Sequence, residues 1–206
     1  NNRTTAYFSY ANTSARGVIP TNTYDKNNVT FKQSTKLFND KVKISSNIML
    51  TSERSFNRPA NGYYLNTLTG LYFFPRQKDF NTYKNEYQIF NTGRNLYLQN
   101  WFVEDHHQSN PYWILNNEPK EDLGKRAIAS VNAEWEIAKG FKFQARANYD
   151  YADKSYEQKH MAGSNATNVS ANGRWAYKKY TDWLAYVDGI FTYNNYFGDF
   201  SVNALA

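Results

Sequence analysis

The chain has 206 residues, of which 41% are hydrophobic, 18% aromatic and 20% charged, and its mean hydropathy is −0.80. The absence of cysteine excludes disulfides and cysteine-ligated metals, and no run of about 18 apolar residues exists that would form a transmembrane helix. The net charge of +6 does not indicate a nucleic-acid partner, because Lys and Arg are spread along the chain and no RNA- or DNA-binding motif is present.

The first quarter of the chain predicts three strands. Thr4–Ala11 is aromatic-rich and strand-like, and residues 12–28 are expected to form a polar connection. Val29–Leu37 and Val42–Thr51 alternate between two kinds of side chain with a period of two, and a short turn at residues 38–41 separates them. This pattern is typical of an antiparallel hairpin.

The alternation stops at residues 54–124, which we expect to form one long connection. It resumes in Lys125–Ile137 and Phe141–Asp153, which flank a tight turn at 138–140. A connection of some 70 residues argues against an ordinary compact soluble domain, in which connections have a median of about 4–6 residues.

A second long connection is expected over residues 154–180, and a third hairpin follows it. Its strands are Trp183–Tyr193 and Phe200–Ala206, with a turn at 194–198. Long and short connections therefore alternate strictly along the chain, as they do in outer-membrane barrels with short periplasmic turns and long extracellular loops.

Strand length points to the same fold class. The central strands reach the roughly 9–11 residues that cross an outer membrane, whereas soluble strands average about 5–6. We therefore predict an all-β chain whose strands form part of an antiparallel transmembrane β-barrel. Two alternatives stay open: a soluble, aromatic-rich carbohydrate-binding β-sandwich, and a small complete barrel.

The count of seven strands bears on the second alternative. Bacterial single-chain barrels have an even number of strands, and an open sheet edge cannot face lipid. Either an eighth strand lies within the long connection, near Asn81–Phe90, or the chain is part of a larger barrel.

Phrases in the connections resemble the SusC/RagA family of TonB-dependent outer-membrane transporters of Bacteroidetes. The resemblance covers essentially the whole chain and rests on an ordered set of short segments: Tyr7–Tyr10, Gly17–Pro20, Asn57–Pro59, Leu68–Arg76, Arg94–Trp101, Asn110–Asn116, Tyr156–Lys159 and Asn172–Gly173.

The resemblance implies a roughly 22-stranded barrel with a plug in its lumen, of which this chain would be a central segment in the outer membrane, crossing it several times. It implies a SusD-like surface lipoprotein as a lid, energy supplied by TonB through an N-terminal part that this chain lacks, and an oligosaccharide or peptide substrate. It implies no cofactor. Lipid of the outer membrane is the expected surroundings of the strands.

Two sets of side chains are candidate contacts. The long connection carries aromatic and basic residues that could stack on sugar rings or peptide side chains, or could instead form the small core of the loop itself: Tyr72, Phe73, Arg76, Trp101, Tyr112 and Trp113. The polar strand faces carry charges of both signs that are expected to face the lumen, where they could contact a plug or line a substrate path: Lys32, Lys43, Glu134, Glu136, Lys142, Arg146 and Asp150.

Metal and enzyme chemistry are not expected. The run Glu104–His107 contains adjacent histidines, which do not face one ligand sphere, and no zinc-binding spacing is present. We expect a solvated loop tip there. His160, the third histidine, is also expected in a loop, and no G-x-S-x-G nucleophile motif occurs.

Overall fold

The computed structural model describes residues 3–105, 107–165 and 169–206. Seven strands form one antiparallel sheet in the order β1-β2-β3-β6-β7-β8-β9. Their bounds are Thr4–Arg16 for β1, Thr23–Leu37 for β2, Val42–Phe56 for β3, Lys120–Ala138 for β6, Phe141–His160 for β7, Arg174–Phe197 for β8 and Phe200–Leu205 for β9. The predicted all-β, seven-stranded antiparallel architecture is confirmed.

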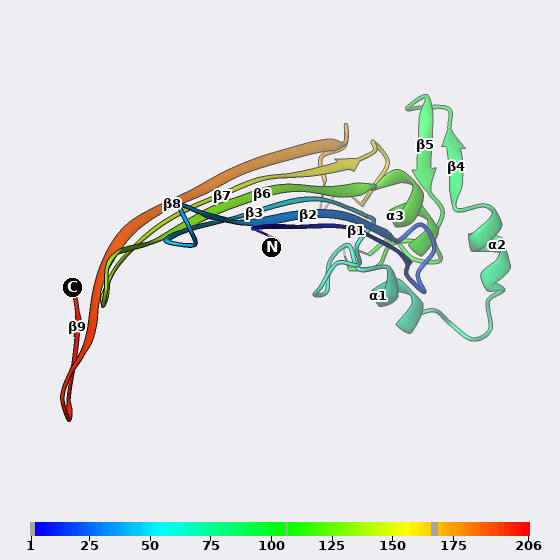
Figure 1. Cartoon of the computed structure of the whole chain (residues 1–206). Coiled ribbons are helices and arrows are strands. Elements are labelled where there is room, and N and C mark those ends of the chain that lie inside the picture. Colours follow the sequence, from blue (N-terminus) through cyan, green and yellow to red (C-terminus); the bar gives the residue numbers. More distant parts are fainter. Residues whose placement is uncertain (1–2, 106, 166–168) are drawn as a thin grey trace.

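The sheet is long, curved and open (Figure 1). Tight turns lie at one end of the strands, and the remaining elements gather at the other end: α1 (Thr67–Tyr72), α2 (Phe80–Asn85), α3 (Pro111–Asn117) and a separate two-stranded sheet of β4 (Gln88–Asn91) and β5 (Leu96–Gln99). The connections at this second end are residues 17–22, 57–119 and 161–173. Two of the three predicted long connections are therefore long, whereas the first, between β1 and β2, is a turn of six residues.

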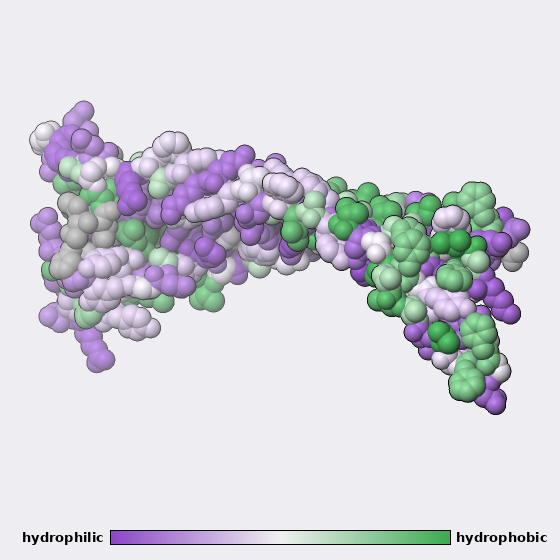
Figure 2. Space-filling view, turned by 90° about the vertical axis from the view of Figure 1, so that its left-hand side faces the viewer, coloured by the Kyte–Doolittle hydropathy of each residue, from purple (hydrophilic) through white to green (hydrophobic). Residues whose placement is uncertain are grey.

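The strand register gives the sheet two chemically different faces, because directly paired residues on neighbouring strands point to the same side. One face carries five consecutive apolar rows, which we call the apolar band. Its first row is Val42, Trp135, Phe143 and Phe191, and its last row is Leu50, Ala127, Tyr151 and Trp183. The opposite face is mostly polar over this stretch, with the apolar side chains Met49, Ile128 and Leu184 in one row. Figure 2 shows the contrast in hydropathy along the molecule, with hydrophobic residues gathered towards one end and hydrophilic residues over most of the rest.

The band is shorter than the strands. On β3 it runs from Val42 to Leu50, a span of about 27 Å along the strand at about 3.4 Å per residue. Beyond it, the same face turns polar in the row Ser52, Lys125, Asp153 and Thr181 and in the rows that follow. We call this polar continuation of β1–β3 and β6–β8 the collar.

The collar explains where the strands differ from the predicted bounds. Residues 12–28 were expected to form a connection, but most of them pair as the ends of β1 and β2, for example Asn12 with Asn27. The expected connections at 54–124 and 154–180 shrink to residues 57–119 and 161–173. In the collar both faces are mostly polar, with a few apolar or aromatic side chains such as Leu123, Trp175 and Tyr177. The ladder therefore continues where the apolar-polar alternation that predicts a strand has ended.

The tight turns use residues that accept left-handed backbone conformations. Asn39 and Asp40 have φ values of 55° and 67° in the β2–β3 turn, and short polar side chains tolerate that region best. Gly140 has φ of 83°, and a Cβ there would lie 2.5 Å from the carbonyl oxygen of Asn194. A glycine is therefore required at the β6–β7 turn.

The connections at the far end form a small packed unit, which we call the loop module (residues 57–119, 161–165 and 169–173). It contains the buried hydrophobic side chains Trp113, Ile114, Leu115 and Val169. Each of its helices starts at a side-chain cap: the Asn66, Asp79 and Asn110 side chains accept a hydrogen bond from the second helical residue. None of the helices in residues 3–105, 107–165 and 169–206 is long and apolar enough to cross a membrane.

Two edges of the main sheet have no neighbour among the described strands. One is the outer edge of β1. The other is β8 between Arg174 and Ile190, because β9 pairs only with Thr192–Phe197 and Ala206 then bonds to Phe191. The sheet is therefore open.

Candidate functional site

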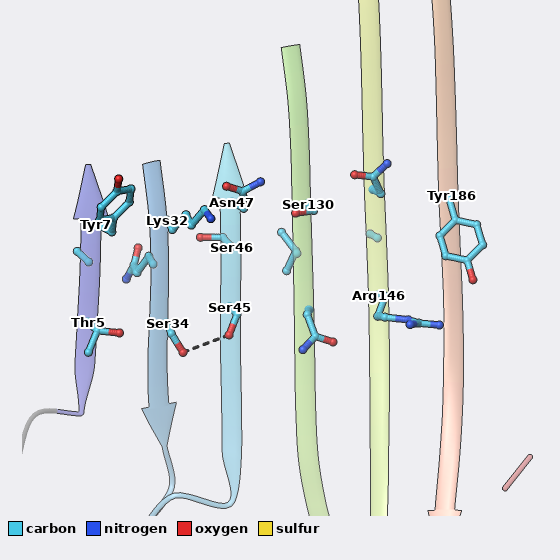
Figure 3. A pocket seen from close by; sticks show the side chains of 16 residues that line it. Thr5, Tyr7, Lys32, Ser34, Ser45, Ser46, Asn47, Ser130, Arg146 and Tyr186 are labelled. Atoms are coloured by element: carbon cyan, nitrogen blue, oxygen red, sulfur yellow. Dashed lines mark hydrogen bonds between the residues drawn. The ribbon is translucent and has the colours of Figure 1, made fainter. Parts of the chain in front are cut away.

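The polar face of the sheet contains a hollow (Figure 3) with a volume of about 730 Å³. Six strands, β1, β2, β3, β6, β7 and β8, contribute to it. Small hydroxyl and amide side chains form its floor, and Tyr7 and Tyr186 stand at opposite ends of one row across the sheet. Because the floor residues are small and their neighbours large, the hollow follows directly from the side-chain sizes in the paired rows.

Arginine–aspartate pairs neutralise much of the charge on this face. Nε of Arg146 donates to Asp188 at 2.9 Å, and the Tyr186 hydroxyl also donates to Asp188. Arg126 binds Asp150 with the same two-nitrogen geometry, with Nε at 2.9 Å. Such bidentate pairs fix the guanidinium plane against the wall.

Lys32 differs from these cations. Its side chain lines the hollow, and it forms no ion pair with another described residue, whereas Lys43 lies 3.9 Å from Glu134. Asn47, its direct partner on β3, has a buried side-chain oxygen that accepts no hydrogen bond within the described part of the chain. A ligand in the hollow could thus contact one positive charge, that of Lys32, and one hydrogen-bond acceptor, the side-chain oxygen of Asn47.

A second hollow of about 680 Å³ lies on the same face, nearer the loop module. Lys26, Glu53 and Lys154 line it in one row with Gly124. The Tyr24 hydroxyl donates to Glu53 at 3.3 Å. The polar face therefore carries charged side chains in both hollows, and in the second hollow they are of both signs.

The register places the predicted lumen-facing residues on this one face: Lys32, Lys43, Glu134, Glu136, Lys142, Arg146 and Asp150. The register also shows the ion-pair partners of Asp150 and Arg146, which the alternation in the sequence did not reveal. Asp188 and Arg126 were not singled out in the sequence, although each is the acidic or basic partner of a residue that was.

The six loop residues predicted as a contact surface separate into three groups: exposed residues, members of an aromatic cluster, and the buried Trp113. Tyr72 and Phe73 are exposed, at 84% and 52%, and Arg76 is exposed nearby. Trp101 and Tyr112 belong to an aromatic cluster built around Phe74 and Phe80.

Trp113 is only 1% exposed, and its indole nitrogen donates to the Ser164 hydroxyl at 2.9 Å. It contributes to the core of the loop module and is closed to a ligand.

Asn57 joins the loop module to the sheet. Its side-chain nitrogen donates to Thr21 at 2.7 Å and to the carbonyl of Leu115 at 2.9 Å, and its oxygen accepts from the backbone of Lys120 at 3.1 Å. Lys120 lies at this joint, and burial lowers the pKa of its side-chain ammonium more than the neighbouring charges change it. Asn57 begins one of the segments that carry the resemblance, Asn57–Pro59, but its role could not be inferred from sequence because it depends on contacts with three distant segments.

A buried pair forms the second joint. His160 was expected in a loop, but it is the last residue of β7 and only 4% exposed, and its Nδ1 lies 3.2 Å from the carboxylate of Glu118. Glu118 is the C-cap of α3. The pair forms because strand β7 extends past the predicted loop boundary and reaches the helix.

The histidine run is also more ordered than the solvated tip expected. His106 lies outside the described residues. His107 is partly buried, packs against Tyr63 and Tyr64 at centroid distances of 4.5 and 5.3 Å, and lies 3.3 Å from Asp105. The described residues contain no group of three or more His, Cys, Asp or Glu side chains that could hold a metal ion.

Comparison with known proteins was made by sequence and by structure. No family model matches the sequence, and no curated protein matches it either. Among solved structures, the chain is similar to one described as "Structure of the RagAB peptide importer in the 'closed-closed' state", with a TM-score of 0.65 and 15% sequence identity.

The match covers 98% of this chain and 22% of the solved chain, so this chain spans about a fifth of that protein's length. At 15% identity the likeness concerns the fold alone. The chain therefore has the fold of a segment of that importer.

Proposed function

We propose that this chain is part of the wall of an outer-membrane β-barrel transporter of the SusC/RagA, TonB-dependent type, and that the complete protein imports peptides. The observation that carries the proposal is the apolar band on one face of an open antiparallel sheet whose opposite face is polar and hollowed. That combination suits a sheet between lipid and a wet lumen, and the likeness to the RagAB peptide importer supports it.

The dimensions of the band support this role. A span of about 27 Å along strands tilted by about 40° gives a height of about 21 Å, which is comparable with the roughly 25 Å apolar belt of outer-membrane barrels. Trp135 and Phe143 lie in its first row, and Tyr151 and Trp183 lie in its last row. Aromatic side chains are favoured at both membrane interfaces, where one part of the ring system is apolar and the other wet.

The open edges of β1 and β8 would pair with further strands of the complete barrel, because unpaired backbone groups cannot remain in lipid. The polar face would then enclose the lumen, and the loop module would lie at its extracellular mouth. A SusD-like lipoprotein would cover that mouth, and TonB would supply energy through a part outside this chain.

Neither alternative is favoured. The small complete barrel needs an eighth strand within residues 54–124, but β4 and β5, the strands described there, form a sheet of their own. The soluble sandwich would bury its apolar face against a second sheet, whereas Val187 in the band is 78% exposed. A peptide is preferred over an oligosaccharide as substrate because the similar solved structure is a peptide importer.

Fractionation of the source cells tests the membrane assignment. We expect the protein in the outer-membrane fraction, with gel mobility that changes on boiling because a folded barrel resists detergent. Recovery as a soluble monomer without detergent would reject the assignment.

Uptake measurements test the substrate. Cells that lack the protein should lose uptake of a labelled peptide mixture and keep uptake of a labelled oligosaccharide mixture, and re-expression should restore the difference. Purification from outer membranes under mild detergent should recover a lipoprotein of the lid type. Loss of oligosaccharide uptake alone would replace peptide by glycan as the substrate class.

A further inference from the structure

Strand β8 carries aromatic side chains at two heights on the face of the apolar band. Trp183 lies in the last row of the band and is 68% exposed. Trp175 and Tyr177 lie on the same face, eight and six residues further along the collar, which corresponds to about 20–26 Å of strand. The membrane interface explains Trp183, but it leaves the second pair unexplained.

The upper pair is ordered and accessible. The two rings are nearly parallel, with an interplanar angle of 18° and centroids 6.1 Å apart. Trp175 is 65% exposed and Tyr177 52% exposed. Large exposed aromatic side chains that lie together away from a core are typical of recognition surfaces.

Polar groups surround the pair and hold it in place. The Trp175 indole nitrogen donates to Glu157 at 2.9 Å, and Lys159 lies 3.2 Å from the same carboxylate. These two hydrogen bonds, that of Trp175 first, hold the pKa of the Glu157 carboxyl below its ordinary value. Lys179 follows Tyr177 on the same face and lies 3.4 Å from Asp153.

This surface combines flat apolar rings with charged hydrogen-bonding groups on both sides. A sugar ring has matching parts, since its C–H face is apolar and its hydroxyl edge is polar. Lys159 is paired with Glu157 and Lys179 with Asp153, so the charges at the margin balance and their polar atoms suit the hydroxyl groups of a sugar. The same strand face continues downward, without interruption by the loop module, into the apolar band.

We propose that Trp175 and Tyr177, with Glu157 and Lys159, form a docking surface for the saccharide headgroups of the glycolipid in the membrane that surrounds the barrel. The inference rests on the proposed function, because the collar stands above the outer leaflet only if the band lies in the membrane. The position favours a glycolipid over a soluble glycan, since the same strand face would hold acyl chains against the band below.

Additional barrel strands would leave the surface open. A strand that pairs with the free edge of β8 lies beside it in the plane of the sheet, so it does not cover the outward face. The surface therefore belongs to the exterior of the complete barrel, away from the polar face and its hollows.

The test uses the full-length protein that contains this chain, reconstituted in lipid discs. The double variant Trp175→Ala/Tyr177→Ala is compared with Tyr180→Ala, a matched control on the same strand that is 54% exposed and lines a hollow of the polar face. Binding of purified lipopolysaccharide is measured in phospholipid discs, and glycolipid that copurifies with the protein is counted by mass spectrometry.

We expect the double variant to bind lipopolysaccharide about tenfold more weakly, as for the loss of two aromatic contacts, and the Tyr180→Ala control to bind as the unchanged protein does. Trp175→Phe should retain most of the binding, because it keeps a ring.

Equal binding by the double variant would overturn the proposal. So would equally tight, Trp175-dependent binding of the lipid-free core oligosaccharide, which would assign the surface to a soluble glycan. Failure of the proposed function would look different: the protein would not fractionate with the outer membrane at all, and the inference would fall with it.

Discussion

The seven-stranded main sheet, which we call the wall, and the loop module differ in how they bury apolar side chains. All four buried hydrophobic side chains of the described residues, Trp113, Ile114, Leu115 and Val169, lie in the loop module. The seven-stranded wall has long apolar rows but no core of its own, and Val187 in the middle of the band is 78% exposed. The loop module can hold its shape through its own contacts, whereas the wall depends on what surrounds it.

The two regions therefore differ in the contacts that stabilise them. In the loop module a few side chains, such as Trp113 and Asn57, each join several parts of the chain. In the wall, backbone hydrogen bonds between neighbouring strands join the chain, and the side chains of its two faces differ in polarity. Substitutions should therefore act locally in the module and according to their face and height in the wall.

Removing the core of the module should have the largest effect. Trp113→Ala removes a fully buried ring and leaves the Ser164 hydroxyl without its partner, which should cost about 3–5 kcal/mol of the module's stability. Limited proteolysis should then cut residues 57–119 quickly while the heat-resistant barrel band on gels remains. Tyr72→Ala, at an 84% exposed position, is the control. Simultaneous loss of the barrel band would show that the two regions are not separate in stability.

A charge in the apolar band tests the wall. Val187 lies in the central row with Ser46, Val131 and Ala147, so Val187→Lys should cost about 2–4 kcal/mol if the band faces lipid. Thr181→Lys, on the same face of β8 but in the collar, should cost about 0–1 kcal/mol. Unfolding from lipid vesicles measures both, and equal costs would contradict the membrane assignment.

Separating the two regions at their joint should have a smaller effect. Asn57→Ala removes hydrogen bonds to Thr21, Leu115 and Lys120, and each unsatisfied buried partner costs about 1–3 kcal/mol. Hydrogen exchange should rise at the base of the module and stay unchanged in β7. Asn95→Ala is matched in backbone conformation, since φ is 48° at Asn57 and 52° at Asn95, and it should leave exchange at the joint unchanged.

The smallest effect on stability is expected on the polar face. Arg146→Gln breaks the pair with Asp188, and exposed ion pairs contribute little to folding because water and salt screen them. The melting temperature should remain close to that of the unchanged protein, whereas the ion selectivity of the barrel with its lumen opened should shift towards cations. A large loss of stability would mean that this face is packed against something other than water.

The same contrast explains what could be predicted from the sequence. The seven strands and the three tight turns could be predicted because apolar and polar residues alternate in the strands over the length of the apolar band, as in Val42–Thr51. The collar was missed because mostly polar side chains occupy both of its faces, so residues such as Asn12 and Asn27 read as a connection although they pair.

The polar face was predictable in position but not in detail. Alternation places Arg146 and Asp150 on one side of β7, while their partners Asp188 and Arg126 depend on the register between strands. The loop module was the least predictable part. The burial of Trp113 and the pairing of His160 with Glu118 come from contacts between segments more than 40 residues apart, and no local pattern encodes them.

The length of the collar also sets the distance between the apolar band and the loop module. Because side chains alternate with a period of two, strands can be lengthened or shortened in steps of two residues, about 7 Å, without exchanging their faces. From Leu50 to Phe56 the wall rises about 20 Å past the band on β3. A sheet with collar strands two residues shorter would keep the same apolar band and the same polar face, yet its loop module, and any partner bound to it, would lie one step nearer the band.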